Sequence, residues 1–272
     1  MTQGTDAAAG PVTPARIPLS EAASTADYRR VPVDRGHPLF DEPLVDLRSR
    51  GIACTSWYHR DDGENPPYGV RIAGSIPQLL VRRSLVEPLL AADRVLKPYG
   101  VALLVVDAWR PLAVQVALFD FFTRRMAEAA PHLPPHELRT RVRTYVSDPA
   151  GFDPDDPRTW PTHSTGAAVD VLLIDRAGGA EIDLGAPFDD MGPAAHSDHF
   201  ERLLDRGAVR PDDPRLLNRR LLHHAMQEAG FVNYPMEFWH FDRGNQMFVA
   251  NLARTGTPAP AAAWYGYARG PE

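Results

Sequence analysis

The stretch PTHSTGAAVDVLLI, residues 161–174, places a carboxylate in the middle of an apolar strand. Residues 167–174 are typical of a buried strand, yet Asp170 stands among valines and leucines. An unpaired charge there would cost several kcal/mol, on the order of its desolvation penalty. We therefore expect Asp170 to be neutralised by a partner or a cation. His163, seven residues earlier, is the first candidate co-ligand.

A second polar group occurs in EFWHFD, residues 237–242, whose last five residues alternate as in a strand. His163, Asp170 and His240 form a candidate zinc site. Three protein ligands leave one coordination position for water or substrate, which is typical of a catalytic zinc site and not of a structural one. Glu237 is the candidate carboxylate for moving protons.

The spacing of these residues does not by itself bring them together. Offsets of seven and three residues place side chains on opposite faces of a uniform strand. Gly166 could turn the chain after His163, and Pro235 makes the entry to the second motif irregular, so we infer that the pairs converge. The alternative is a hydrogen-bonded Asp170 with two structural histidines.

Acyl transfer also requires a cation or donor at the developing oxyanion, and VVDAWRPL, residues 105–112, offers Arg110. Arg110 follows a buried strand and precedes a helix with proline in its first turn, where functional side chains are often presented. The alternative is a structural ion pair of Arg110 with Asp107 or Asp120.

Two other histidine pairs compete for a metal. His196 and His199 stand about one helical turn apart. His223 and His224 are adjacent on an expected helix, where neighbouring side chains point about 100° apart and cannot face one ion. For both pairs we favour a surface polar role.

The remaining pattern predicts an α+β fold in which helices pack around a small antiparallel or mixed sheet. Ser84 and Glu87 have the spacing of a capping box at the start of a helix, and Gly230 is the expected end of another. The other expected elements are strands at 44–47 and 101–107 and helices at 111–130, 137–145 and 213–229.

Composition narrows the function classes. The chain has 272 residues and a formal charge of −6, and no block of lysine or arginine indicates nucleic-acid or anionic-membrane binding. The longest strongly apolar run, 101–106, is far shorter than the roughly 20 residues of a membrane span. Small molecules are therefore the expected partners.

The N-terminal residues lack the basic start and apolar stretch of a secretory signal. The single cysteine, Cys54, excludes an intrachain disulfide and is compatible with a reducing compartment. We therefore expect a cytoplasmic protein with a disordered tail at 1–25 and one domain at 26–272.

These residues resemble a known family, the zinc D-alanyl-D-alanine dipeptidases of the VanX type. The resemblance covers most of the chain from about Val45 to Phe248, and its most specific block is the long C-terminal one. The matching motifs are DAWRP, THSTGAAVD, FDDM and NRRLLHHAMQEAGFVNYPMEFWHF. It implies the α+β fold of zinc D,D-carboxypeptidases.

The resemblance also implies roles for individual residues. His163, Asp170 and His240 would hold one zinc ion per chain, Glu237 would be the catalytic base and acid, and Arg110 would stabilise the tetrahedral intermediate. It further implies that Asp189, a carboxylate in FDDM, holds the free amino terminus of the dipeptide. This contact would be a charge-assisted hydrogen bond.

The chain departs from the family pattern in places that bear on the substrate. Pro161 stands where the family commonly has serine, and it supplies neither a hydroxyl nor a backbone N–H. Trp109 replaces the usual tyrosine before the arginine, and TSWYHRDDGENPPYG, residues 55–69, is a divergent substrate-side loop. We expect Trp109 and Pro161 to reach a bound dipeptide.

The expected function is zinc-dependent hydrolysis of D-Ala-D-Ala or a related small D-configured dipeptide. One alternative is a zinc amidase or dipeptidase of specialised metabolism with a changed pocket. Another is a metal-binding protein without catalysis, which would need neither Glu237 as a proton shuttle nor Arg110 as an oxyanion partner.

Overall fold

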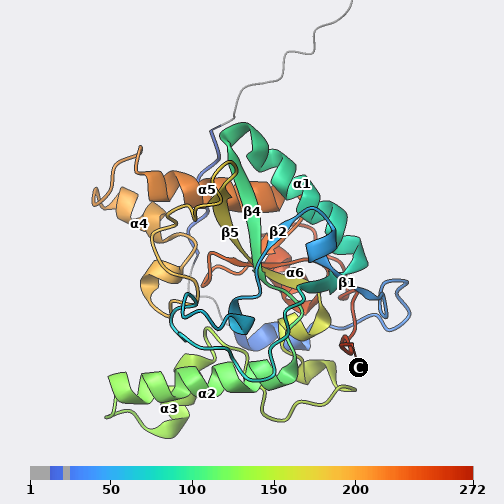
Figure 1. Ribbon diagram of the computed structural model, residues 1–272. Helices are drawn as coiled ribbons and strands as arrows, with labels where there is room; N and C mark the ends of the chain where they lie inside the picture. Colours follow the sequence, from blue (N-terminus) through green and yellow to red (C-terminus); the bar gives the residue numbers. More distant parts are fainter. Residues whose placement is uncertain (1–12, 21–24, 272) are drawn as a thin grey trace, which may run out of the picture.

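A five-stranded mixed sheet runs through the centre of the computed structural model, which describes residues 13–20 and 25–271 (Figure 1). Its strand order is β2-β4-β5-β7-β6, with β2 parallel to β4 and the other neighbours antiparallel. A separate antiparallel pair joins β1 to β3. The strands are β1 Leu44–Asp46, β2 Ala53–Cys54, β3 Leu80–Arg82, β4 Val101–Asp107, β5 Ala168–Asp175, β6 Val232–Asn233 and β7 His240–Asp242.

The long strands β4 and β5 form the hydrophobic centre of this sheet. All residues of β4 and the first six of β5 are buried, as their mainly apolar sequences predict. Their register pairs Leu103 with Leu173, and after an irregularity it pairs Asp107 with Asp170. The apolar register therefore brings two carboxylates together at one end of the sheet.

Helices flank the sheet, and Figure 1 shows α1 and α5 toward one end of the molecule and α2 and α3 toward the other. The pairs α1–α5 and α2–α3 are in contact, and α6 packs against β6 and the short 3-10 helix Thr25–Arg30. This is the expected α+β fold. The helices are α1 Val86–Leu96, α2 Leu112–Ala129, α3 Pro135–Val142, α4 His199–Asp205, α5 Pro214–Glu228 and α6 Gln246–Arg254.

Local sequence signals succeeded at α5 and failed at α1. Asp213 caps α5 by accepting a hydrogen bond from the Arg215 backbone N–H at 3.0 Å, and Gly230 follows the helix with φ 79°. The expected capping box at Ser84 is wrong. The Ser84 hydroxyl instead donates to Glu42 Oε2 at 2.6 Å, a contact with a distant segment that local spacing does not reveal.

The expected disordered tail at 1–25 falls partly outside the described residues, which omit 1–12 and 21–24. Within 13–20, Ile17 is buried and its backbone N–H donates to Glu201 Oε1 at 3.0 Å. An apolar side chain and a buried carboxylate thus hold this segment against α4.

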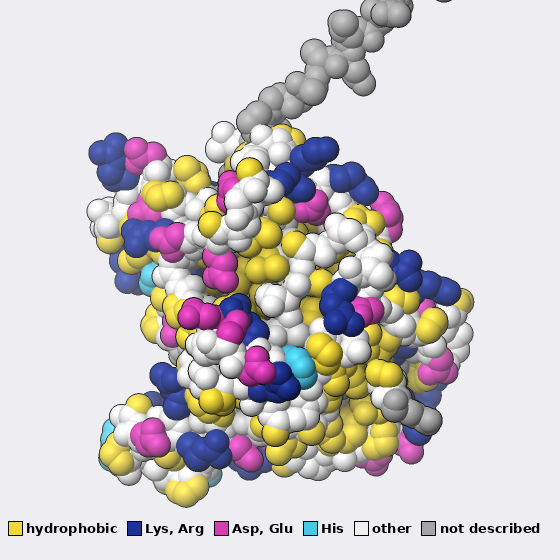
Figure 2. All heavy atoms as spheres, viewed as in Figure 1, with side chains coloured by type: hydrophobic (Ala, Val, Ile, Leu, Met, Phe, Trp, Pro, Cys, Tyr) yellow, Lys and Arg dark blue, Asp and Glu magenta, His cyan; other side chains and the backbone are white. Residues whose placement is uncertain are grey.

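The surface drawn in Figure 2 carries acidic and basic side chains interspersed with apolar ones. In the part of the chain that the structure describes, none of the helices combines the length and apolar character needed to cross a membrane.

Candidate active site

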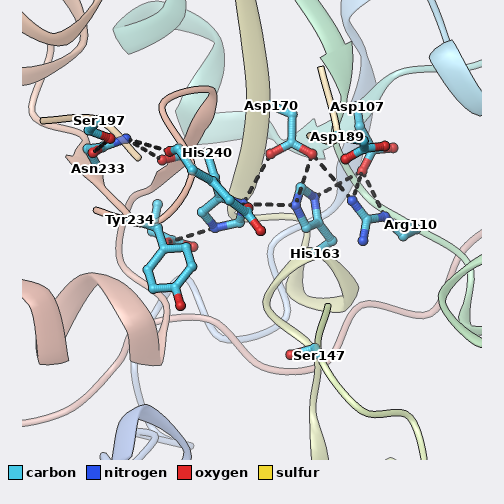
Figure 3. A network of polar contacts seen from close by, with 12 residues as sticks. Asp107, Arg110, Ser147, His163, Asp170, Asp189, Ser197, Asn233, Tyr234 and His240 are labelled. Atoms are coloured by element: carbon cyan, nitrogen blue, oxygen red, sulfur yellow. Dashed lines mark hydrogen bonds and ion pairs between the residues drawn. The ribbon is translucent and has the colours of Figure 1, made fainter. Parts of the chain in front are cut away.

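His163, Asp170 and His240 converge at one end of the central sheet, where their side chains point toward one another (Figure 3). Asp170 of β5 lies directly opposite His240 of β7 in the antiparallel register. His163 lies in the 3-10 turn Thr162–Thr165, and Gly166 turns the chain into β5 with φ 70°. Potential ligand atoms of the three residues all lie within 4.8 Å of one another. The glycine turn after His163 and the pairing of β5 with β7 therefore bring the three side chains together despite their irregular spacing in the sequence.

The hydrogen bonds around the two imidazoles orient their lone pairs toward a common point. His163 Nδ1 lies 2.7 Å from the Ala108 carbonyl oxygen, and His240 Nε2 lies 3.0 Å from Asp242 Oδ2. Because these acceptors take the ring protons, His163 Nε2 and His240 Nδ1 face each other as acceptors at 3.1 Å. Asp170 adds carboxylate oxygens at 3.4 Å and 3.1 Å from these nitrogens. Three acceptors with outer hydrogen-bond partners fit a zinc ion.

The electrostatics of this group favour positive charge at its centre. Burial alone would raise the pKa of Asp170, but His163 and His240 hold that pKa well below its ordinary value. Burial alone would lower the pKa of His240, but Asp242 and Asp170 raise it well above its ordinary value. A cation between the three side chains satisfies both tendencies.

Arg110 lies beside this group, just after β4, and is buried. Its Nε donates to Asp107 Oδ2 at 2.9 Å, and its Nη2 lies 3.3 Å from Asp170 Oδ2. Gln115 Oε1 accepts from Arg110 Nη1 at 2.9 Å, and Arg110 Nη2 donates to the Tyr58 hydroxyl at 3.3 Å. The alternative ion pair with Asp107 is therefore present. It fixes the guanidinium at the edge of the candidate metal site.

Glu237 reaches the same site from the turn that precedes β7. Its Oε2 lies 3.8 Å from His240 Nδ1, and burial raises its pKa well above the ordinary value. The expectation of a strand over 238–242 is wrong for Phe238 and Trp239, which lie in a turn, so that β7 begins at His240. That turn brings two residues three positions apart onto one side of the chain.

Asp189 is half-buried near Arg110, in the left-handed conformation with φ 61°. Its Oδ2 accepts hydrogen bonds from Tyr58 at 3.0 Å and Tyr68 at 2.8 Å, and burial raises its pKa to about 7. Both tyrosines come from the divergent loop 55–69. A left-handed backbone is uncommon outside glycine and is held here by these tertiary contacts.

One small cavity, about 50 Å³, connects these groups. Its walls include His163, Asp170, His240, Glu237, Arg110 and Asp189. Sequence reasoning missed several others, because segments distant in sequence deliver them; these are Tyr28, Tyr58, Gln115, Tyr145, Ser147 and Tyr234.

Trp109 and Pro161 are not among the residues that line this cavity, and their contact with a bound dipeptide stays a prediction. The Trp109 indole N–H donates to the Ala268 carbonyl at 2.9 Å, and its ring occupies the space beside Gly270. The Trp109 indole therefore packs against the C-terminal segment. The local sequence around Trp109 does not predict this long-range contact.

The competing histidines lie elsewhere. Among the described residues, His163, Asp170 and His240 are the group of three potential ligands close enough together to hold one metal ion. His196 stacks on Tyr145 with ring centroids 6.4 Å apart. His223 is partly buried on α5, and burial lowers its pKa to about 4, so the expected surface role is wrong for this residue.

Two imidazoles and a carboxylate, beside a buried glutamate and arginine in one cavity, indicate the class of metal-dependent hydrolases. The sequence model of the D-ala-D-ala dipeptidase family, peptidase family M15, matches residues 74–255. The chain therefore belongs to this family.

Individual relatives agree with the family match. The chain is 29% identical over 170 residues to a D-alanyl-D-alanine dipeptidase of Synechocystis sp., covering 60% of this chain and 68% of that protein. The corresponding protein of Escherichia coli is 28% identical over 163 residues, which cover 60% of this chain and 66% of that protein. The aligned parts thus span about two thirds of these relatives.

A solved structure, VanYB in complex with D-alanine-D-alanine, aligns with 85% of this chain and 94% of that chain. Its TM-score is 0.40 and its sequence identity is 14%, a distant likeness from which we argue nothing.

Proposed function

We propose that this protein is a zinc-dependent dipeptidase that hydrolyses D-Ala-D-Ala or a closely related small D-configured dipeptide to free amino acids. The observation that carries the proposal is the convergence of the three candidate ligands with Glu237 and Arg110 in one buried cavity. Membership of the D-ala-D-ala dipeptidase family supports this choice of substrate.

His163, Asp170 and His240 would hold one zinc ion per chain. When bound, the ion would supply a Lewis acid and favour ionisation of water near neutral pH. Ala108 and Asp242 fix the orientation of the two imidazoles by accepting their outer N–H groups.

Glu237 moves the protons in this proposal. Burial raises its pKa, so the carboxylate readily accepts a proton from the attacking water and can pass it to the leaving amine. Arg110 presents its guanidinium to the carbonyl oxygen as negative charge develops there. Its contacts with Asp107 and Gln115 hold it in position before the substrate arrives.

Asp189 would receive the free amino group of the substrate. Its carboxylate lines the cavity and has two tyrosine hydroxyls as neighbours. An ammonium group against Asp189 would form a charge-assisted hydrogen bond and select for a free N-terminus. The cavity volume of about 50 Å³ favours short substrates.

A panel of L,L-, L,D- and D,D-dipeptides, assayed with the zinc-loaded protein, tests the proposal. We expect D-Ala-D-Ala and other small D,D-dipeptides to be cleaved, with activity removed by a chelator and restored by zinc. Cleavage confined to L,L-dipeptides would reject the substrate assignment, and absence of hydrolysis across the panel would reject the activity.

A further inference from the structure

One end of the cavity is built by a segment that precedes the family match at 74–255. Tyr28, from the 3-10 helix Thr25–Arg30, and Ser147 both line the cavity. The Tyr28 and Ser147 hydroxyl oxygens lie 2.8 Å apart, and Tyr28 is buried. Figure 3 shows Ser147 well apart from Asp189 and Arg110. The cavity thus has a pair of hydroxyls at a distance from its carboxylate end.

Arg29 lies directly behind these hydroxyls. Its Nε donates to the Tyr28 hydroxyl oxygen at 3.1 Å, and its Nη2 lies 3.4 Å from Ser147 Oγ and 3.2 Å from the Asp148 carbonyl oxygen. These partners are all neutral, and the described residues include no carboxylate that forms an ion pair with Arg29. Its charge is therefore directed toward the hydroxyl pair.

A second source of positive charge lies close by. Asp148 accepts hydrogen bonds from Arg139 and from Arg143. Arg143 also lines the cavity. At the other end stand Asp170, Asp189 and Arg110, with the candidate ligands His163 and His240. The Ser147 end of the cavity is thus flanked by guanidinium groups, at a distance from Asp189.

This end of the cavity is fixed in position relative to the proposed chemistry. Gln115 Nε2 donates to the Ser147 carbonyl oxygen at 2.7 Å, while Gln115 Oε1 accepts from Arg110 at 2.9 Å. A single buried side chain therefore spans the distance between the segment that carries Ser147 and the oxyanion arginine.

We propose that Ser147 and Tyr28, with Arg29 behind them, form the subsite that receives the free C-terminal carboxylate of the substrate. The inference rests on the proposed function, which places the ammonium group at Asp189. A zwitterionic dipeptide then spans the cavity from Asp189 to the hydroxyl pair, with its peptide bond between the two ends. The Ser147 hydroxyl rotates to donate to the carboxylate, and the Arg29 charge strengthens that hydrogen bond. The subsite requires a free carboxylate and excludes peptides extended beyond it.

The test compares D-Ala-D-Ala with its C-terminal carboxamide on the zinc-loaded full chain. Because a carboxamide lacks the charge, we expect wild-type kcat/KM to favour the acid by about 30-fold or more. Ser147→Ala and Arg29→Gln should reduce this preference to about threefold, chiefly through a higher KM for the acid. Arg30→Gln, on the same short helix, is the matched control and should keep the wild-type preference.

A binding measurement separates this inference from the proposed function. Calorimetric titration of acid and amide into zinc-loaded Glu237→Gln protein, with and without Arg29→Gln, reports recognition without hydrolysis. Preferential binding of the acid that Arg29→Gln abolishes supports the subsite even if the wild-type protein cleaves neither peptide. Equal binding of acid and amide, binding of neither, or an Arg29→Gln variant with unchanged preference overturns it.

Discussion

Asp242 offers a sharp test of the metal site, because it touches a candidate ligand without being one. It is fully buried, its Oδ2 lies 3.0 Å from His240 Nε2, and its Oδ1 accepts from Asn245 Nδ2 at 2.6 Å. Asn245 Oδ1 in turn accepts the Phe248 backbone N–H at 2.9 Å, which fixes the orientation of its amide as the cap of α6. Both oxygens of Asp242 are therefore committed as acceptors.

The substitution Asp242→Asn keeps the size of this side chain and replaces one acceptor by a donor. If the new NH2 group faces Asn245, two donors meet and the cap of α6 is lost. If it faces His240, the imidazole must carry its proton on Nδ1, the atom directed at the metal. A hydrogen bond to a charged group contributes about 1.5–3 kcal/mol, so zinc affinity should fall about 10- to 100-fold.

The assay is zinc competition against a chromogenic chelator, with Asp120→Asn, an exposed change on α2, as the matched control. Asp120→Asn should leave the zinc Kd unchanged. A zinc Kd for Asp242→Asn within twofold of the wild-type value would refute the argument that Asp242 sets the orientation of His240.

Three further predictions follow from the same geometry. His163→Ala should lose most of its zinc by metal analysis, whereas His224→Ala, outside the ligand group, should keep it; full occupancy in the first variant would contradict the ligand assignment. Arg110→Ala should keep zinc but lose at least about 10²-fold in kcat, and near-normal turnover would refute its oxyanion role. Burial lowers the folded-state pKa of His223 to about 4 from 6.5, so the unfolded state binds a proton first and stability is lost as pH falls from 6.5 toward 4. Urea unfolding across this range should show a loss of about 1–3 kcal/mol that His223→Gln reduces, and an unchanged slope would count against this cause.

The fold was predictable where a single segment carries its own signal. Mainly apolar sequences predicted β4 and β5, and Asp213 with Gly230 delimited α5. Very short elements such as β2 and β6 carry too few residues for a pattern, and they form because longer strands offer them an edge. The Ser84 cap failed because Glu42, distant in sequence, binds the hydroxyl.

The candidate site was predictable to the extent that its chemistry is unusual for a core. Asp170 in an apolar strand is unusual, and so are the histidines His163 and His240. The roles of these residues were inferred from the resemblance to a known family. Tyr58, Tyr68 and Gln115 were missed because tyrosine and glutamine are ordinary residues whose positions depend on tertiary contacts. The hydrogen bond of the Trp109 indole to the Ala268 carbonyl was likewise not predictable from the local sequence.

The central claim is that a buried zinc site with Glu237 as its proton carrier hydrolyses a small D-configured dipeptide. The most direct test measures zinc content and D-Ala-D-Ala hydrolysis in the same preparations of wild-type and Glu237→Gln protein. The account predicts about one zinc per chain in both proteins and a loss of at least about 10²-fold in turnover for the variant. Loss of zinc from Glu237→Gln, or turnover close to that of the wild-type protein, would contradict it.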